Sequence, residues 1–443
     1  MKDKNPDFEI NIEMLSPTHV GNGNIISSLG EYFLTSDRVI FPEHEKMHTA
    51  ISEIGKMDEY IEFILNHEGK LNVYDQLKKW DIPVEIKRTL RLNQNKQITD
   101  QNNNLYEHIK NGDDKGRAYI PGSSLKGMIR TALIYQYIEN NNRLKREFND
   151  EIRSILSDSN PKKEYLKYWT QFESQIFSEQ LARAIRCEDS GEAMDEDLIV
   201  EQVHRTGSIG TDTDTLDWLV ESVGEGCILD TRIVLNPFHL KKIKEGIQIQ
   251  TLSDIISALN SYSKVNLVFE KNEIRNSNLE AAVKNQVLEQ INDLLFMIEE
   301  SNDEYAVARI GKGKTAIFQT IWMNIEAPLR EKIIQLFKKE GQEIYPETRV
   351  LTVNGKQMMG WIKLDKNKPP KNIFDNKVES LNQGDVLKAT VLQKKKVEVS
   401  VNGKTYIVDM INKFIEFEEY ELIEVVVHQL KKDGTLSQVK PKS

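Results

Sequence analysis

The sequence predicts an α+β fold with a small β-rich domain at its C-terminal end. Three observations favour this class: an alternating apolar pattern near the start, long segments with helical periodicity in the middle, and short β-rich runs after a proline-containing linker. The 443 residues correspond to roughly three domains of about 150 residues each, so a single small module is excluded.

The first part of the chain has the pattern of strands and tight turns. Apolar and polar residues alternate from Phe8 to Met14, as in a strand with one buried face. The segment 16–24 contains a proline and two glycines and should form a loop. Two short apolar runs, 32–34 and 39–41, are separated by polar residues and predict a hairpin.

The middle of the chain is mainly helical in pattern. We expect helices within 143–185 and 241–300, and a polar surface loop at 93–104. Residues 305–326 return to strands and glycine turns, and 359–364 have the pattern of a last strand of the main body. The clearest helical stripe consists of Leu279, Val283, Val287, Ile291, Leu294, Leu295 and Ile298.

A change of composition marks the C-terminal domain. The lysine- and proline-rich run 366–371 predicts a stiff polar linker and therefore a domain boundary. Beyond it, Asn402-Gly403 is a strong hairpin turn between β-rich runs. The runs 385–391, 397–401, 404–408 and 422–427 predict a small five-stranded barrel of the OB type. Lys394, Lys395 and Lys396, near Tyr406, could add a nucleic-acid surface or form a solvated hairpin end.

Acidic and basic residues are unevenly distributed. The net charge of −10 comes from 69 acidic and 59 basic residues, which argues against a surface that is positive all over. Residues 186–230 contain 13 acidic and two basic residues, whereas 78–130 contain 11 basic and six acidic ones. Because phosphate attraction is screened beyond about 8–10 Å at physiological salt, a local basic groove for nucleic acid is compatible with this acidic chain.

Several protein classes are excluded by what the sequence lacks. Cys187 and Cys227 are too few for a disulfide framework or a four-cysteine zinc site. No apolar run approaches the roughly 20 residues of a membrane span, and no secretory signal follows the first residues, so we expect a cytoplasmic location. Neither a metal-ligand spacing nor a GxSxG nucleophile pattern occurs, so we predict no metal, no cofactor and no catalytic residue.

The most distinctive motif lies at 119–133 and predicts the start of a helix. Pro121 and Gly122 form a turn, and Ser123 or Ser124 can serve as the N-cap. The free N–H groups of the first helical turn can bind a phosphate, and Gly122 lacks the Cβ atom that would block its approach.

The same motif carries two cations. Lys126 and Arg130 are four residues apart and share a helix face, so both could contact one stretch of sugar-phosphate backbone. Gly127 between them would also allow close approach of a ligand. The alternative is an ordinary capped helix with solvated basic residues.

The third glycine loop along the chain, at 305–315 after those at 16–24 and 119–133, resembles the end of a Walker A motif in Gly313-Lys314-Thr315. A Walker A loop needs a glycine five positions before Gly313, where this chain has Ala308, so the match fails at the tight turn. A nucleotide-binding switch is therefore a minor alternative.

The remaining composition of this loop suits a phosphate chain that is held without hydrolysis. Its three basic residues, Arg309, Lys312 and Lys314, are interleaved with Gly311 and Gly313. A solvated hairpin is the alternative interpretation.

The first glycine loop contains His19 between Pro17 and Gly21, with Gly23 beyond. An imidazole there could stack on a base or bond to a phosphate, or it could be a structural loop residue.

The acidic residues Asp212, Asp214 and Asp217 offer another alternative, a metal-dependent ribonuclease. Flexible acidic loops are the better interpretation, because no lysine or histidine base lies nearby. The acidic segment could instead face a basic partner protein.

Together the three glycine loops resemble the RAMP superfamily of CRISPR effector subunits, and within it the type III-A (Csm) subunit that caps the 3′ end of the crRNA. The likeness is carried by 16–23, by 120–127 with Arg130, and by 309–313, and it spans about residues 7–365. The resemblance implies two ferredoxin-like (RRM-like) domains with helical insertions.

On this basis we expect three domains, 1–185, 186–368 and 369–443. The resemblance also implies partners: the single-stranded crRNA, other RAMP backbone subunits, and trimming nucleases, with no membrane. The expected function is a non-catalytic RNA-binding subunit that supports crRNA maturation and complex assembly in antiviral defence. The RNA-recognition octamer with its stacked aromatics is absent, so we do not expect the sheet face to read bases.

Overall fold

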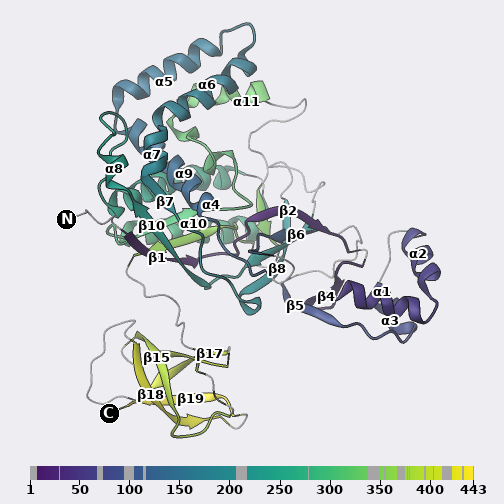
Figure 1. Ribbon diagram of the computed structural model, residues 1–443. Helices are drawn as coiled ribbons and strands as arrows, with labels where there is room; N and C mark the ends of the chain where they lie inside the picture. Colours follow the sequence, from purple (N-terminus) through teal and green to yellow (C-terminus); the bar gives the residue numbers. More distant parts are fainter. Residues whose placement is uncertain are drawn as a thin grey trace. The chain divides into compact units, whose positions relative to one another are not determined.

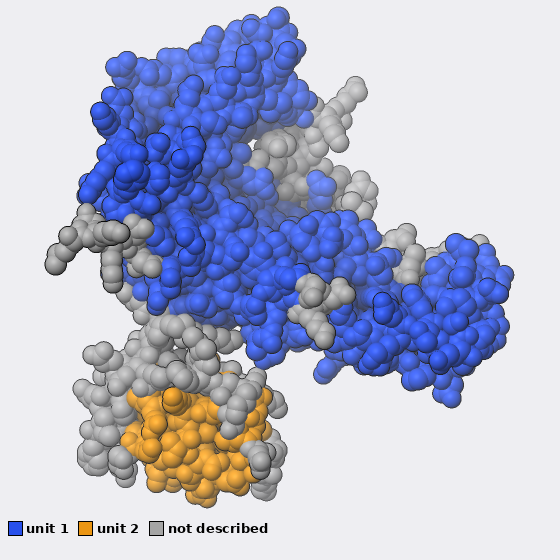
Figure 2. Space-filling view, viewed as in Figure 1, with its two compact units in different colours: residues 1–366 blue, residues 367–443 orange. Residues whose placement is uncertain are grey.

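The structure is a computed structural model in which the chain forms two compact units, residues 1–366 and 367–443 (Figure 2). The structure describes residues 7–28, 30–66, 73–93, 104–112, 116–205, 217–277, 279–337, 349–353, 356–366, 375–376, 378, 380–393, 396–402, 404–411, 422–431 and 434–442. The loop predicted at 93–104 lies almost entirely outside them.

The first sheet of unit 1 has five antiparallel strands drawn from both ends of the unit. They are β1 (Asp7–Met14), β7 (Ile185–Cys187), β10 (Ile228–Leu235), β11 (Tyr305–Arg309) and β13 (Trp361–Asp365), in the spatial order β11-β13-β1-β10-β7. The strand predicted from Phe8 to Met14 is confirmed, with Ile10, Ile12 and Met14 buried. The strand predicted at 359–364 is also confirmed, although it begins at Trp361.

The second sheet of unit 1 has eight strands and includes the predicted hairpin at 32–41. In the spatial order β2-β6-β9-β8-β5-β4-β3, with β12 also paired to β8, its strands are β2 (Gly21–Ile26), β3 (Phe33–Leu34), β4 (Arg38–Pro42), β5 (Ile86–Asn93), β6 (Leu105–His108), β8 (Leu198–Arg205), β9 (Asp217–Val223) and β12 (Val350–Thr352). Phe33 and Leu34 pair with Ile40 and Val39, which confirms the hairpin.

Helices fill the segments predicted from periodicity, and three further helices follow the hairpin (Figure 1). The helices are α1 (His44–Glu53), α2 (Met57–Leu65), α3 (Val73–Lys79), α4 (Gly122–Glu139), α5 (Asn142–Ile155), α6 (Pro161–Ile176), α7 (Glu179–Ala184), α8 (Pro237–Leu240), α9 (Leu252–Asn276), α10 (Ala281–Glu300) and α11 (Ala327–Phe337). Of the predicted stripe, Val287, Ile291, Leu294 and Ile298 are buried in α10, whereas Leu279 precedes this helix, which begins at Ala281. None of the helices in the described part of the chain combines the length and apolar character that a membrane span requires.

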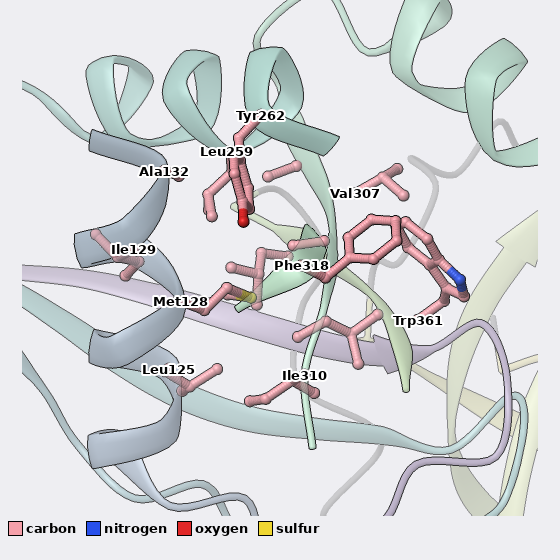
Figure 3. Packing of buried hydrophobic residues seen from close by; sticks show 14 of the residues in the cluster. Leu125, Met128, Ile129, Ala132, Leu259, Tyr262, Val307, Ile310, Phe318 and Trp361 are labelled. Atoms are coloured by element: carbon pink, nitrogen blue, oxygen red, sulfur yellow. The ribbon is translucent and has the colours of Figure 1, made fainter. Parts of the chain in front are cut away.

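The main core lies where α4 and α9 pack against the first sheet. Figure 3 shows Leu125 and Met128 of α4 pointing toward the middle of the cluster, where Tyr262 of α9 and Phe318 also lie. Trp361 has no exposed surface, and its ring meets that of Phe318 edge to face, with centroids 5.4 Å apart. Each such buried side chain contributes about 1.5–3 kcal/mol, so this layer holds α4 firmly on the sheet.

Unit 2 has its own hydrophobic core and a closed ring of strands. Its strands are β14 (Asp375–Asn376), β15 (Val386–Gln393), β16 (Lys396–Val401), β17 (Lys404–Met410), β18 (Leu422–Leu430) and β19 (Leu436–Pro441). The pairings run β16-β15-β18-β19-β17 and return to β16, and only β17–β19 is parallel within this ring. The hairpin turn predicted at Asn402 connects β16 and β17, whereas β19 was not predicted.

A buried ion pair joins α9 to the residue before β12. Arg349 donates from Nε and Nη2 to the carboxylate oxygens of Glu270 at distances of 2.7 to 3.0 Å. The two side chains are 5% and 0% exposed, so water does not screen the pair.

We expect Arg349→Met to lower the free energy of unfolding by about 3–5 kcal/mol, because it leaves the Glu270 carboxylate buried without its counter-charge. The double variant R349M/E270M should recover most of the loss, since it removes both charges. Urea denaturation followed by circular dichroism measures both effects. A double variant as unstable as the single one would contradict this explanation.

Candidate nucleic-acid interface

The first and third glycine loops meet in the structure. The backbone N–H of Lys312 donates to the carbonyl oxygen of His19 at 2.8 Å. Gly311 has a φ of +73°, and a Cβ atom at this position would collide with the same carbonyl oxygen. Glycine is therefore required at 311 both for its backbone conformation and for the close contact between the loops.

A third segment, just before β13, completes this junction. Ile310 N–H donates to the carbonyl of Gly360 at 2.7 Å, and Gly360 N–H donates to that of Pro17 at 3.0 Å. Gly360 has a φ of +84°, and a Cβ atom there would collide with the carbonyl oxygen of Ile310. Three segments remote in sequence thus contact one another through their backbones.

The junction places Lys312 over two aromatic rings of the second sheet. Its Nζ lies 3.1 Å from the ring centroid of Tyr106 and 5.5 Å from that of Trp218. The two rings meet edge to face, with centroids 6.4 Å apart. All three side chains are partly exposed, and we call this group the lysine–aromatic platform.

The two lysines of the third glycine loop, Lys312 and Lys314, have lowered pKa values. Burial lowers the pKa of Lys312 to about 8. Burial, together with the charge of Arg309, lowers the pKa of Lys314 to about 8 as well. Both amines are therefore charged at neutral pH but poorly compensated, which favours contact with an anion.

Two cations of the basic segment 78–130 are neutralised inside the molecule. Arg88 and Lys110 donate to the carboxylate of Glu221 at 2.7 and 3.2 Å. Glu221 is fully buried, and burial alone would raise its pKa, but the charges of Arg88 and Lys110 hold that pKa below its usual value. The basic segment and the acidic segment 186–230 thus compensate each other here.

His19 has a structural position in this junction. Its side chain is 2% exposed, and Nδ1 lies 2.7 Å from the backbone carbonyl of Glu221. Burial lowers the pKa of His19 to about 4, so the ring is neutral at physiological pH. Gly21 is exposed directly over this ring, and Gly23 is exposed with open space around it. We therefore leave His19 out of the proposed RNA surface.

The second glycine loop uses its helix terminus for packing. The N-cap of α4 is Pro121, not Ser123 or Ser124 as predicted, because the carboxylate of Asp189 accepts the N–H of Gly122 at 2.8 Å. A side chain at Gly122 would collide with the backbone of Cys187, the last residue of β7. Asp189 therefore occupies the position predicted for a phosphate.

The two cations of the second loop face neighbouring helices. Lys126 donates to the carbonyl of Ala182 in α7, and Arg130 donates to the Glu173 carboxylate in α6 at 2.9 Å. Gly127, on the same helix, is exposed with no atom near its missing Cβ. We leave Lys126 and Arg130 out of the proposed RNA surface because these contacts hold their charges within the protein.

Arg309 is likewise part of the core. It is 4% exposed, its Nε donates to the Met359 carbonyl at 2.9 Å, and its guanidinium lies 5.0 Å from the ring of Phe318. Burial lowers the pKa of Arg309 to about 10. Of the three basic residues in this loop, Lys312 and Lys314 are partly exposed. Each of them follows a glycine with a positive φ angle, Gly311 or Gly313.

Sequence reasoning missed Tyr106 and Trp218. The absence of the RNA-recognition octamer led to the expectation that the sheet face would not use aromatics. An aromatic in β6 and another in β9 give no local motif, because the two strands are more than a hundred residues apart along the chain. Only the parallel pairing of β6 with β9 brings the rings together.

The residues proposed for a metal-dependent nuclease lie mostly outside the described part of the chain. Asp212 and Asp214 are not described, nor is the side chain of Asp217. Among the described residues, no group of three or more histidine, cysteine or acidic side chains is arranged to hold a metal ion. Lys394 and Lys395 also lie outside the described residues, and Lys396 is exposed in β16.

Comparison with known proteins identifies a family and a set of relatives. The model of the RAMP superfamily matches residues 11–316. "CRISPR system Cms protein Csm5" of Mycobacterium tuberculosis is 23% identical over 290 residues, which cover 57% of this chain and 73% of that protein.

Two solved structures have a similar fold. A chain of the "Csm-crRNA-target RNA ternary complex in type III-A CRISPR-Cas system" superposes with a TM-score of 0.60 at 19% identity, covering 81% of this chain and 100% of that one. The crystal structure of T. onnurineus Csm5 superposes with a TM-score of 0.56 at 18% identity, covering 80% and 99%.

We expect Gly311→Ala to destabilise unit 1 by about 3 kcal/mol or more, because the new methyl group separates the two loops and breaks the Lys312–His19 hydrogen bond. Gly23→Ala is the matched control, since Gly23 also has a positive φ, of +92°, but has open space around it. It should cost about 1–2 kcal/mol for its backbone strain alone. Equal losses in thermal unfolding would show that the loop contact contributes nothing.

Proposed function

The chain belongs to the RAMP superfamily, and we propose that it is a non-catalytic crRNA-binding subunit of a type III-A CRISPR effector complex. In this role it caps the 3′ end of the guide and supports crRNA maturation and complex assembly in antiviral defence. Its partners are the crRNA, the other RAMP backbone subunits and nucleases that trim the guide. The names of its relatives, and the RNA-bound complex that contains a chain of similar fold, support this proposal.

The observation that carries the proposal is the lysine–aromatic platform. An aromatic side chain that stacks on a base contributes about 1–3 kcal/mol for any of the four bases, because every base has a π-face. Lys312 adds a cation beside Tyr106 and Trp218, and Lys314 follows two residues later in the same loop. This combination suits a single strand that is held through stacking and phosphate attraction.

We also infer a ferredoxin-like layout for the first sheet. Without β13, its strands have the spatial order β11-β1-β10-β7, and chain order alternates them with helices α4 and α9. The order fourth-first-third-second of four antiparallel strands with two helices characterises that fold. This sheet takes strands from both sides of residue 185, so the domain division predicted at that residue stays a proposal that awaits a test.

For unit 2 we infer the OB class. Five strands close a ring through β16–β17 and through the parallel pair β17–β19. Closure of a small antiparallel barrel by such pairings is the arrangement of OB domains, many of which bind oligonucleotides.

The direct test of the function is co-expression with the neighbouring subunits, followed by sizing of the RNA that copurifies. With this chain present, the guide should have a defined 3′ end, because the cap protects it from trimming beyond the subunit. A guide with the same 3′ end in the absence of the chain would refute the proposed capping role.

Substitutions in the platform should weaken RNA binding. Trp218→Ala should reduce the affinity for short single-stranded RNA about tenfold, because one stacking contact is lost. Lys312→Ala should reduce the slope of log affinity against log salt by about 1, since one phosphate contact disappears. Fluorescence anisotropy with labelled RNA measures both effects.

Lys244→Ala is the matched control. Lys244 is exposed on the loop between α8 and α9, and this loop neither pairs with a strand of the second sheet nor adjoins one in sequence. It should leave affinity and salt slope near the wild-type values. If the three variants behave alike, the platform is not the RNA-binding surface.

RNA affinity should also depend on pH near 8. Below its pKa of about 8 Lys312 is charged and attracts phosphate, and above that pH the charge is lost, so affinity should fall between pH 7 and 9. Lys312→Arg should reduce this fall, because arginine stays protonated throughout that range. A pH profile that is the same in the wild type and in this variant would assign the effect to other groups.

A further inference from the structure

A polar cavity opens on the second sheet, beside the first glycine loop. Its volume is about 360 Å³, within the range of about 300–1,000 Å³ that small-ligand sites occupy. Arg91 and Asn93 of β5, Glu201 of β8, Pro17 of the first glycine loop and Gln357 before β13 line it. The cavity is thus assembled from segments far apart in sequence, including one that forms the loop junction.

The cavity contains a buried carboxyl group that forms no ion pair in the described part of the chain. Glu201 is 1% exposed, and both of its carboxyl oxygens accept from Nδ2 of Asn93 at 3.0 Å. Buried acids in proteins are normally paired with a cation, because an unpaired buried charge is costly. Among the residues that the structure describes, the donor within hydrogen-bond distance of the Glu201 carboxyl is the amide of Asn93.

Glu221, on the neighbouring strand β9, provides the contrast within the same sheet. It is as deeply buried as Glu201, but Arg88 and Lys110 bond to it and keep its pKa low. Burial raises the pKa of Glu201 to about 7, against the donated hydrogen bond of Asn93 and the charge of Arg91. Glu221 thus has a structural ion pair, whereas Glu201 lines the cavity with two carboxyl oxygens that share one amide donor.

The cavity and the lysine–aromatic platform share one face of the second sheet. In the β8–β9 pairing, Glu201 lies opposite Val220 and Val203 lies opposite Trp218. Tyr106 is in register with Val220 on the other side of β9. Strands β8 and β6 are therefore two spacings apart, about 10 Å, so a strand of a few nucleotides can reach both places.

The donor and acceptor pattern selects a ligand. A carboxylate has two oxygens side by side and is matched best by two adjacent N–H donors. Among the four bases, only guanine presents two such donors, N1–H and the exocyclic amine, on its pairing edge; the others present a donor next to an acceptor. Arg91 is exposed at the rim, where it can meet a phosphate, and Ile199 and Pro17 offer apolar surface to the face of a base.

We propose that this cavity binds a guanine base of the bound RNA strand, with Glu201 accepting hydrogen bonds from N1–H and the exocyclic amine, and Arg91 at the phosphate. The inference rests on the proposed function, because it places this base in a strand held by the platform. It adds a sequence preference at one position to binding that is otherwise indifferent to sequence.

The test compares labelled hexamers of uridine with hexamers in which one uridine is replaced by guanosine, inosine or adenosine, all with the full-length protein. Wild type should prefer the guanosine hexamer about tenfold over the uridine hexamer, and inosine, which lacks the exocyclic amine, should lose most of that preference. Glu201→Gln should abolish the preference without changing affinity for the uridine hexamer. Glu196→Gln, an exposed acid in the turn before β8, is the charge-matched control and should retain it.

The pH profile gives a second readout that a merely structural role of Glu201 would not produce. The charged groups that face Glu201 are Arg91 and Glu225, and Asn93 is its neutral donor. Since the carboxylate form accepts both guanine donors, the guanosine preference should increase as pH rises through about 7 in the wild type and should be flat in Glu201→Gln. A preference for adenosine or cytidine that grows below pH 7 would overturn the proposal in favour of a protonated Glu201.

A direct titration with guanosine 5′-monophosphate, followed by calorimetry, separates this inference from the proposed function. Binding that depends on Glu201, without affinity for uridine hexamers, would support the cavity and refute the RNA-binding role of the platform. Affinity for uridine hexamers without any guanosine preference would do the opposite. Thermal unfolding of Glu201→Gln verifies that the variant is folded. If Glu201→Gln does not fold, Arg91→Gln takes its place in the titration and should weaken the binding of guanosine monophosphate.

Discussion

The proposed RNA surface depends on the contact between three backbone segments, which approach closely because Gly311 and Gly360 have no side chains. Gly311 lies against the His19 carbonyl and Gly360 against that of Ile310, both with positive φ angles. A Cβ atom at either position would force the segments apart. Because Lys312 follows Gly311 directly, this contact sets the direction of its side chain and places the amine over Tyr106. The glycines therefore act through the protein's own packing, and the ligand-binding property follows from it.

Two buried acids of the second sheet differ in whether a cation pairs with them. Glu221 neutralises Arg88 and Lys110 on the side of the sheet that faces the main core, and its carbonyl also holds His19. Glu201, on the opposite face, accepts from the amide of Asn93 and pairs with no cation among the described residues. The first arrangement stabilises the sheet and the loop that crosses it, because Glu221 pairs with both cations and Lys110 pairs with Glu107 as well. The second leaves an acceptor beside a cavity, which is the arrangement expected of a ligand site.

The second glycine motif illustrates how a binding-like pattern can serve the fold. The backbone N–H of Gly122 in the first turn of α4 would suit a phosphate, but it donates to the carboxylate of Asp189. The cations one and two turns later bond to α6 and α7. The opposite side of the same helix packs on α9, so α4 is used for packing on both sides (Figure 3). A sequence pattern that suits a phosphate can thus serve the packing of the protein itself.

Sequence periodicity by itself determined the local elements: the strand from Phe8 to Met14, the stripe of α10 and four of the strands of unit 2. These are readable because burial of one face imposes a repeat of 2 or 3.6 residues on neighbouring positions. The glycine loops were also readable, since turns need glycine locally. Only the tertiary structure decided which cations remain available, because Arg88 pairs with an acid 133 residues away. Long-range contacts also fix the backbone, since the N–H of Trp361 donates to the hydroxyl of a serine 345 residues away. Tyr106, Trp218 and Glu201 gain their significance from strand pairing, and pairing depends on contacts between distant segments that no local pattern records.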